Sequence, residues 1–331
     1  MNDKIDFVVT WVDGSDPKWL AEKKKYNSSI NVEEEICRYR DMKIFKYWFR
    51  AVEKYTPWVN KIYLITWGHL PDWINTSNEK LVIVNHEDYI PKKYLPTYNS
   101  NVIELNINKI KDLSDNFVLF NDDFFIINPM KETDFFRNNV PCEEYAENII
   151  MPIGYNESFS HTALNNMGYI NKNYDKKSVM KKNFFKYFNL KYGLNNVRTL
   201  CLLPWKNFSL IYDPHLPVSM KKSYFQKLWD DSYNMMDSVS SNRFRSNTDI
   251  NQYLIRYMQL LDGNFIPRKH GIGKMYNLSN ETDKICKALN SKKYKMICIN
   301  DSNECINFEK KVKKIECVLE RKLPEKSKFE K

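Results

Sequence analysis

The sequence has no long hydrophobic run: a stretch of about 18 apolar residues, the length that spans a bilayer as a helix, occurs nowhere in it. The N-terminus, MNDKIDFVVT, passes from a charged start directly into a short strand and lacks the apolar segment of a signal peptide. We therefore expect a cytoplasmic protein whose contact with the inner face of the plasma membrane is at most peripheral.

Cysteine pairs and nucleic-acid motifs are also missing. The seven cysteines are scattered, odd in number and without a CxxC pair, so we expect reduced structural thiols and no zinc site. The net charge of +10 comes without zinc-finger spacing, an RNP-like strand or a DNA-binding helix signature. The charge therefore indicates nucleotide donors, acidic polymers or an anionic membrane surface as partners, and we expect no nucleic acid.

Glycine is scarce, with 8 residues, whereas hydrophobic residues reach 43% and charged ones 28%, so a globular fold is expected and wholesale disorder is not. The first part of the chain alternates strand and helix patterns. Strands are predicted at 6–12, 61–66 and 81–85, and helices at 38–55 and 100–110. This order predicts an α/β fold, in which ligands bind beyond the carboxyl ends of the strands.

The second part of the chain is less regular. Residues 130–210 are polar, rich in Asn and Lys, and are predicted to form a largely helical insertion that carries acceptor contacts. Helices are predicted at 221–229 and 250–261, the second with Thr248 or Asp249 as its N-cap. A last strand is predicted at 295–300, and residues 305–331 should form a basic terminal helix or tail after a main domain of residues 1–304.

Residues 117–127, FVLFNDDFFII, are the most informative segment. Asn121, Asp122 and Asp123 interrupt a hydrophobic strand. Burying an ionised carboxylate is strongly unfavourable unless a metal or a cationic group neutralises it. We therefore predict a strand that leads to a carboxylate-lined cleft; a plain turn between two strands is the alternative.

Several blocks together resemble the Stealth family. They are TWVDGSDPKW at 10–19, the stretch from Arg38 through PWVNKIYLITWG, HEDYIP, LPTYNSNVIELNINKIKDLSDNFVLFNDDFF, RFRSNTD at 243–249 and ICIND at 297–301. The family contains bacterial capsular polysaccharide phosphotransferases and the catalytic part of an animal N-acetylglucosamine-1-phosphotransferase. The resemblance implies a Rossmann-like, glycosyltransferase-A-type mixed sheet with flanking helices. It also implies transfer of a hexose-1-phosphate from a UDP-sugar to an acceptor hydroxyl of a capsular or surface polysaccharide, with release of UMP.

Such chemistry depends on positioning and charge neutralisation, and the family's usual cofactor is a divalent cation, Mg²⁺ or Mn²⁺. Carried over to this sequence, the resemblance assigns catalytic, substrate-binding and metal-binding roles. The proposed catalytic residues are Asp123 as general base, Asp122, Glu104, Arg245 on the transferred phosphate and His215 on the departing UMP. The proposed substrate-binding residues are Asp13, Gly14, Ser15, Asp16, Arg38, Asn121 and Arg243, and the proposed metal ligands are Asp122, Asn300 and Asp301.

Each assignment has an ordinary structural alternative. Asp13–Asp16 also reads as an Asp-Gly turn before Pro17, Glu104 as a helix-surface carboxylate, and His215 as a structural histidine. Arg40 is a weaker candidate for the donor diphosphate. His86 is left open between a functional group and a strand-end cap, and core packing competes with base stacking for Trp11 and Trp19.

Two rival functions remain. A conventional metal-dependent glycosyltransferase would use the same donor but break the sugar–oxygen bond and release UDP. A non-catalytic module that binds nucleotide sugars or polysaccharide would not need carboxylates and arginines converging from several segments. N-acetylglucosamine-1-phosphate is the donor group that the resemblance favours.

Overall fold

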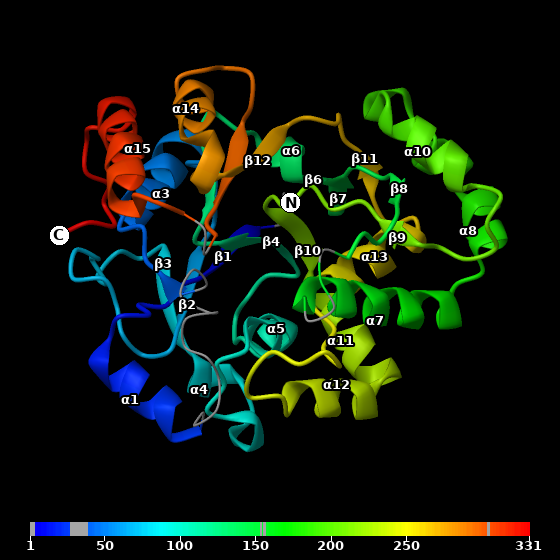
Figure 1. Cartoon of the computed structure of the whole chain (residues 1–331), viewed down its shortest axis with the longest axis horizontal. Helices are drawn as coiled ribbons and strands as arrows, with labels where there is room; N and C mark the ends of the chain where they lie inside the picture. The colour runs from blue at the N-terminus through cyan, green and yellow to red at the C-terminus, as the bar shows by residue number, and fades with distance from the viewer. Residues whose placement is uncertain (1–3, 27–38, 153, 155–156, 303–304) are drawn as a thin grey trace.

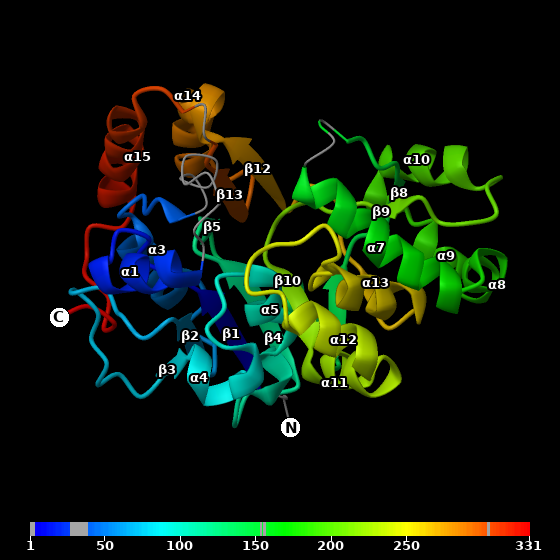
Figure 2. The ribbon, with the colours of Figure 1, turned by 60° about the horizontal axis from the view of Figure 1, so that its bottom comes forward.

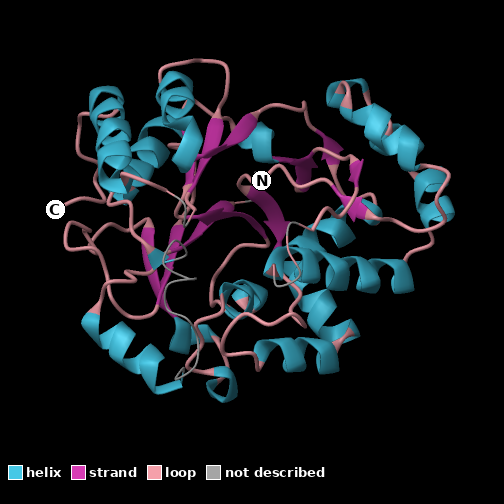
Figure 3. Ribbon diagram, in the orientation of Figure 1, coloured by secondary structure: helices cyan, strands magenta, loops and turns pink. Residues whose placement is uncertain are grey.

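The computed structural model describes residues 4–26, 39–152, 154, 157–302 and 305–331. Its largest sheet has five strands in the order β10-β4-β1-β2-β3 (Figures 1 and 3). The first four strands along the chain are parallel, and β10 runs antiparallel beside β4. This mixed sheet with flanking helices confirms the predicted α/β class. The strand bounds are β1 Ile5–Thr10, β2 Ile62–Thr66, β3 Leu81–Asn85, β4 Asn116–Asn121 and β10 Val218–Lys221.

Both faces of this sheet are buried. Along β1, Phe7 and Val9 pack into one hydrophobic core, and Val8 between them packs into the other. Side chains of successive strand residues point to opposite faces, so a strand covered on both sides reads as a continuous apolar run. The first core contains residues of α3 Phe45–Tyr55, α14 Leu278–Leu289 and α15 Phe308–Lys322, and the second contains residues of α7 Ser158–Asn173, α11 Lys222–Asp231 and α13 Tyr253–Leu261.

Three smaller sheets accompany the large one, in the orders β12-β13-β5, β11-β7-β6 and β8-β9. The first of them matters most for the site, because β5 follows β4 directly in the chain and yet pairs with β13. The bounds are β5 Phe124–Ile126, β6 Phe136–Arg137, β7 Val140–Glu143, β8 Glu147–Asn148, β9 Leu210–Ile211, β11 Ile266–Pro267, β12 Gly273–Asn277 and β13 Met296–Asn300.

The other helices lie around these sheets (Figure 2). The α-helices are α1 Pro17–Tyr26, α4 His86–Tyr89, α5 Ser100–Leu105, α6 Glu132–Phe135, α8 Lys176–Lys182, α9 Phe184–Tyr187, α10 Asn195–Leu202 and α12 Tyr233–Ser240. Short 3-10 turns occur at Lys92–Tyr94, Ile107–Lys109 and Leu190–Tyr192. Within the described residues, no helix combines the length and the apolar character needed to cross a bilayer.

The predicted strands at 61–66, 81–85 and 295–300 and the helix at 221–229 are confirmed within a residue or two. Of the helix predicted at 38–55, Phe45–Tyr55 forms α3, whereas Arg40–Ile44 are not helical and Lys43 takes a left-handed conformation, φ 56°. The helix predicted at 100–110 is divided at Asn106, whose side chain donates to the carbonyl of Val102. Helices α1, α12 and α14 were not predicted.

The predicted N-cap of the helix at 250–261 is wrong. Helix α13 begins at Tyr253, after Gln252. Asp249 does not cap it, because its buried carboxylate accepts hydrogen bonds from the amides of Asn99 (2.8 Å), Asn101 (3.1 Å) and Asn242 (2.7 Å). These donors hold the 242–249 loop against α5.

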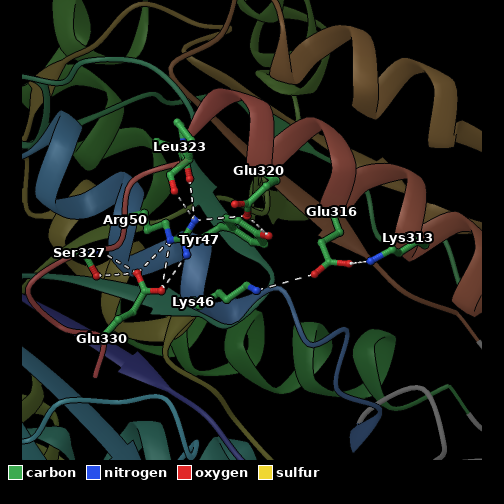
Figure 4. Close-up of polar contacts among 10 residues, drawn as sticks. Lys46, Tyr47, Arg50, Lys313, Glu316, Glu320, Leu323, Ser327 and Glu330 are labelled. Atoms are coloured by element: carbon green, nitrogen blue, oxygen red, sulfur yellow. Dashed lines mark hydrogen bonds and ion pairs between the residues drawn. The ribbon is translucent and has the colours of Figure 1, made fainter.

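The chain beyond residue 305 folds back onto α3 through helix α15 (Figure 4). Arg50 on α3 pairs with Glu330 (Nη2–Oε2, 2.9 Å) and donates to the carbonyl of Leu323 (2.8 Å). Tyr47 donates to Glu320 at 2.5 Å, and the backbone N–H of Ser327 donates to Glu330 at 2.8 Å. The C-terminal residues are therefore held against the core by buried charge-assisted contacts.

Candidate active site

The Asp122–Asp123 turn lies between two sheets. Strand β4 ends in the main sheet at Asn121, and β5 begins in the second sheet at Phe124. The carbonyl of Asp123 accepts a hydrogen bond from the backbone N–H of Ile299 on β13 (3.0 Å), which fixes the turn to that sheet. The predicted single strand is therefore two strands, and the carboxylates stand at the carboxyl end of β4, where ligands bind in such folds.

A cavity of about 460 Å³ opens at this turn. It collects side chains from every block of the family resemblance and, in addition, from the start of α7 in the 130–210 segment, which contributes Ser158, Phe159 and Thr162. The predicted site residues that line it are Glu104, Asn121, Asp122, Asp123, His215, Arg245, Asn300 and Asp301.

Asp123 lies at the centre of a cluster with His215 and Cys298. One ligand atom from each residue lies within 4.8 Å of the other two. The Cys298 thiol donates to Oδ2 of Asp123 at 3.3 Å. Within the described part of the chain, Oδ1 of Asp123 is buried without a hydrogen-bond partner. An orphaned carboxylate oxygen is costly, so it marks a place for a cation or a donor hydroxyl.

His215 is positioned by its backbone. It adopts a left-handed conformation (φ 51°), and its N–H donates to Oδ1 of Asp213 at 2.8 Å. Its Nδ1 lies 3.3 Å from the hydroxyl of Tyr253, and its ring packs edge-on against Phe124. Non-glycine residues rarely adopt this conformation unless their surroundings impose it, and such residues concentrate at functional sites.

The carboxyl groups in the cavity have perturbed acidities. Burial, together with the neighbouring charges of Asp123 and Asp41, raises the pKa of Asp122 to about 8. Burial also raises the pKa of Asp123, against the opposing effect of His215, and the pKa of Asp41. Like charges in a poorly solvated cleft disfavour ionisation, so this wall of the cavity favours a cationic ligand.

Glu104 and Arg245 also line the cavity. Burial raises the pKa of Glu104 to about 7, and the positive charge of Arg245 opposes that rise. Arg245 donates from Nη2 to the hydroxyl of Ser100 at the start of α5 (2.8 Å). The arginine thus reaches the cavity from the 243–249 loop, and Glu104 is a buried carboxyl group, not the helix-surface residue of the alternative interpretation.

Asp301, a predicted metal ligand, is paired with an arginine. Both its carboxylate oxygens accept hydrogen bonds from the guanidinium of Arg40, at 2.7 to 2.9 Å, and that guanidinium also stacks on the ring of Phe308. A bidentate pair of this kind neutralises the carboxylate and orients the arginine. Arg40 and Asp301 both line the cavity, so this oriented arginine is available to a ligand there.

The Asp13–Asp16 turn is outside the cavity lining. Oδ1 of Asp13 accepts from the N–H of Ser15 (2.8 Å), and Oδ1 of Asp16 accepts from the N–H of Trp19 at the start of α1 (2.8 Å). A Cβ on Gly14 would lie 2.1 Å from the carbonyl oxygen of Tyr39, so glycine is needed for close packing here. These contacts form an Asp-Gly turn before Pro17, and substrate binding by its residues stays a prediction.

Two further residues predicted to bind substrate are arginines, Arg243 and Arg38. Arg243 is absent from the cavity lining; it donates to the carbonyl of Pro96 (2.9 Å) and covers the ring of Tyr26. Arg38 lies outside the described residues. His86 does line the cavity, and burial lowers its pKa to about 4.

Trp11 and Trp19 line the cavity but are almost completely buried. Trp11 stacks parallel to Phe45, and Trp19 packs against Tyr39 and Tyr98. Both therefore take part in core packing, and base stacking stays a prediction.

Sequence reasoning missed Cys298, Asp41 and Tyr253. Cys298 lies in the buried strand β13 among apolar residues, and its spacing in the sequence does not indicate a contact with Asp123. Asp41 lies inside a resembling block and Tyr253 lies outside them, and neither the effect of Asp41 on Asp122 nor the contact of Tyr253 with His215 follows from spacing, because both depend on packing.

The chain is similar to known protein families and to named proteins. Residues 3–30 match the model of Stealth protein conserved region 1 and residues 38–143 that of Stealth protein conserved region 2. The capsular polysaccharide phosphotransferase WcwK of Streptococcus pneumoniae is 46% identical over 99% of this chain and 98% of its own. The exopolysaccharide phosphotransferase cps2G of Lactiplantibacillus plantarum is 44% identical over 99% of this chain and 96% of its own.

Among solved structures, the galactosyltransferase LgtC in complex with donor and acceptor sugar analogues aligns with 94% of this chain and 95% of its own, at 8% identity and a TM-score of 0.36. The two relatives named above as polysaccharide phosphotransferases are 44–46% identical to this chain over almost its full length. The chain therefore belongs to the Stealth family.

Proposed function

We propose that this protein transfers a hexose-1-phosphate from a UDP-sugar to a hydroxyl of a capsular or extracellular polysaccharide. The products would be a phosphodiester and UMP. The names of its relatives support the phosphotransfer. The observation that carries the proposal is the unpartnered Oδ1 of Asp123, at the end of a strand and in a cavity shared with Arg245 and His215.

In the proposed reaction, the acceptor hydroxyl attacks the sugar-linked phosphorus and gives its proton to Oδ1 of Asp123. The bond between that phosphorus and the oxygen bridging the two phosphates breaks, and UMP leaves with the bridging oxygen. Burial raises the pKa of Asp123, which makes it a stronger base than an exposed aspartate. Cys298 holds the other carboxylate oxygen, so the base is oriented before substrate arrives.

Arg245 would neutralise charge that develops on the transferred phosphate, as a guanidinium does in other phosphoryl transfers. Its contact with Ser100 directs it to the cavity. Arg40, oriented by Asp301, is the second cationic group available to the donor diphosphate. His215 would donate a proton to the departing UMP, with Tyr253 holding its other ring nitrogen.

The residues present fit a divalent cation. Asp122 and Asn121 line the cavity beside Asp123 and offer oxygen ligands of the kind that Mg²⁺ and Mn²⁺ prefer. Burial and neighbouring carboxylates raise the pKa of Asp122, and a cation bound there would relieve that unfavourable charge. A bound cation would neutralise the charge of the diphosphate. Excess chelator should remove activity, and an added divalent cation should restore it; full turnover in chelator would exclude the metal.

We propose that the acceptor glycan binds in a second cavity, of about 1060 Å³. Both cavities are lined in part by α7: Thr162 lines the first, and Leu164 and Tyr169 line the second. Aromatic rings such as Tyr169 and Tyr233 pack against the C–H faces of sugars, and amides such as Asn165 bind their hydroxyls.

A substitution at Gly168 tests this proposed glycan-binding site. It also lines the second cavity, and a Cβ added there would meet no atom within 4 Å. Gly168→Phe should therefore raise the acceptor KM without unfolding the protein, and Gly168→Ala is the matched control. An unchanged acceptor KM in the Phe variant would place the glycan elsewhere.

The nucleotide product is the direct test of the reaction. Purified protein, a panel of UDP-sugars, Mg²⁺ or Mn²⁺ and a capsule-type acceptor should yield UMP, and Asp123→Asn should not. UDP would instead mean a conventional glycosyltransferase. No nucleotide release with any donor, together with donor binding unaffected by Asp123→Asn, would favour the binding module.

The same panel would identify the donor, for which N-acetylglucosamine-1-phosphate is our first expectation. We propose a cytoplasmic site of action. The described cysteines are free thiols, which suits a reducing compartment.

A further inference from the structure

An exposed apolar patch covers the part of the molecule formed by α9, α10 and the turns around them. Within residues 185–205, six large apolar side chains are more than half exposed; these residues, called the 185–205 patch below, are Phe185, Leu190, Leu194, Val197, Leu200 and Trp205. Leu190 is 98% exposed and Leu194 is 86% exposed. Figures 1 and 2 both place α8 and α10 at the edge of the molecule away from α15. Apolar exposure concentrated in one segment of this kind is typical of an interaction site.

The patch is held outward by contacts on the inner side of α10. Asn195 lies 3.0 Å from Nδ1 of His270, and the hydroxyl of Thr199 accepts from the N–H of Glu147 (3.1 Å). The ammonium group of Lys176 donates to Glu147 and to the carbonyl of Leu202, each at 2.7 Å. These buried contacts anchor both ends of the helix, so its apolar outer face is a fixed feature of the fold.

Helical spacing explains why the outer face is apolar. Leu194, Val197 and Leu200 are each three residues apart, so they lie close together on the outer side of α10, and Asn195 and Thr199 face inward. Trp205 follows just after the helix and is 62% exposed.

The charge around the patch has a single sign. Residues 176–210 contain eight Lys or Arg and no Asp or Glu. Lys177, Lys181, Lys182, Arg198 and Lys206 are exposed. A surface with aliphatic side chains, a tryptophan and basic groups, and with no acidic residue, matches the apolar boundary and the anionic headgroups of a lipid bilayer. A second copy of the chain would bring the same positive charge and be repelled.

We propose that the 185–205 patch docks this protein on an anionic membrane surface, with its apolar side chains in the acyl boundary and the neighbouring lysines among the headgroups. Helix α7, which begins at the catalytic cavity, leads directly into α8 beside the patch. Its 16 residues span about 24 Å. The patch would therefore hold the cavity within reach of a membrane-bound acceptor, and the docking itself does not depend on the proposed reaction.

Vesicle flotation tests the docking without any catalysis. Full-length protein is mixed with phosphatidylglycerol-rich vesicles or with pure phosphatidylcholine vesicles, in the absence of donor and acceptor. We expect binding to the anionic vesicles that weakens with salt. Leu190→Gln with Leu194→Gln should weaken it about tenfold or more. The matched control is Met151→Gln with Ile306→Gln, which removes two similarly exposed apolar side chains elsewhere and should bind like wild type.

Light scattering in solution tests whether a second copy of the chain covers the patch instead of a membrane. The wild-type protein and the leucine variant should both be monomeric. A dimer that the leucine variant converts to monomers would show that the patch is an interface between copies and would overturn the proposal. Absence of binding by wild type, or equal binding by wild type and the leucine variant, would also overturn it. Because UMP release from soluble substrates is measured separately, failure here leaves the proposed reaction intact.

Discussion

Replacing Glu104 by glutamine should stabilise the protein, and the gain should grow with pH. Glu104 is 8% exposed and lies on α5 at the wall of the cavity. Burial raises its pKa from an ordinary value of 4.5 to about 7, although Arg245 opposes the rise. Glutamine keeps the shape of the side chain and removes the charge.

The sign follows from proton linkage. The unfolded chain releases the Glu104 proton near pH 4.5, and the folded protein keeps it until about pH 7. Raising the pH between these values therefore favours the unfolded chain. A pKa difference from 4.5 to 7 corresponds to about 3 kcal/mol, of which about 2.5 kcal/mol falls between pH 5 and pH 9.

Urea denaturation at pH 5, 7 and 9 measures the effect. The free energy of unfolding of Glu104→Gln minus that of wild type should become more positive by about 2.5 kcal/mol from pH 5 to pH 9. Other titrating groups cancel in this difference. Parallel curves for the two proteins would refute the buried, perturbed carboxyl group that the structure indicates.

Three further predictions concern catalysis and the C-terminal segment. Asp123→Asn should lower kcat by about 10²–10⁴-fold, because the amide cannot take the acceptor proton, with an unchanged melting curve as the check on folding. Arg245→Ala should lower kcat/KM about 10²–10³-fold. Arg243→Ala, on the same loop but outside the cavity lining, should lower it far less. Equal losses in the two variants would contradict the proposed role of Arg245 in neutralising the transferred phosphate. Arg50→Ala should lower the free energy of unfolding by about 3–5 kcal/mol, because it leaves Glu330 buried and unpaired. Lys46→Ala, which breaks a longer and more exposed pair with Glu316, should cost about 1 kcal/mol or less in the same denaturation series.

Much of the fold was accessible from local patterns. Strands β1, β2, β3 and β13 were predicted from apolar runs, because a strand buried on both faces of a sheet carries few polar residues. Helix α1 was missed because it is short and lysine-rich, with Trp19 as its only buried residue. The N-cap prediction at Asp249 failed because amides from α5, far away in the sequence, compete for the carboxylate.

The candidate site divides in the same way. An Asp pair inside an apolar segment needs a partner wherever it folds, so its place at a carboxylate-lined cavity was predictable from the cost of burying charge. The pairing of Asp301 with Arg40 was not, because it joins residues 261 positions apart through the packing of several elements. The cluster of Asp123 with Cys298 depends in the same way on the pairing of β5 with β13.

The sequence by itself determined the α/β class, the membership of the Stealth family and the segments that carry the site. These are properties of local composition and spacing, which unfolded and folded chains share. Only the tertiary structure decided which carboxylate oxygen lacks a partner, which arginine reaches the cavity and which apolar residues stay outside the core. Each of those depends on the relative placement of elements, and a one-dimensional pattern does not contain that placement.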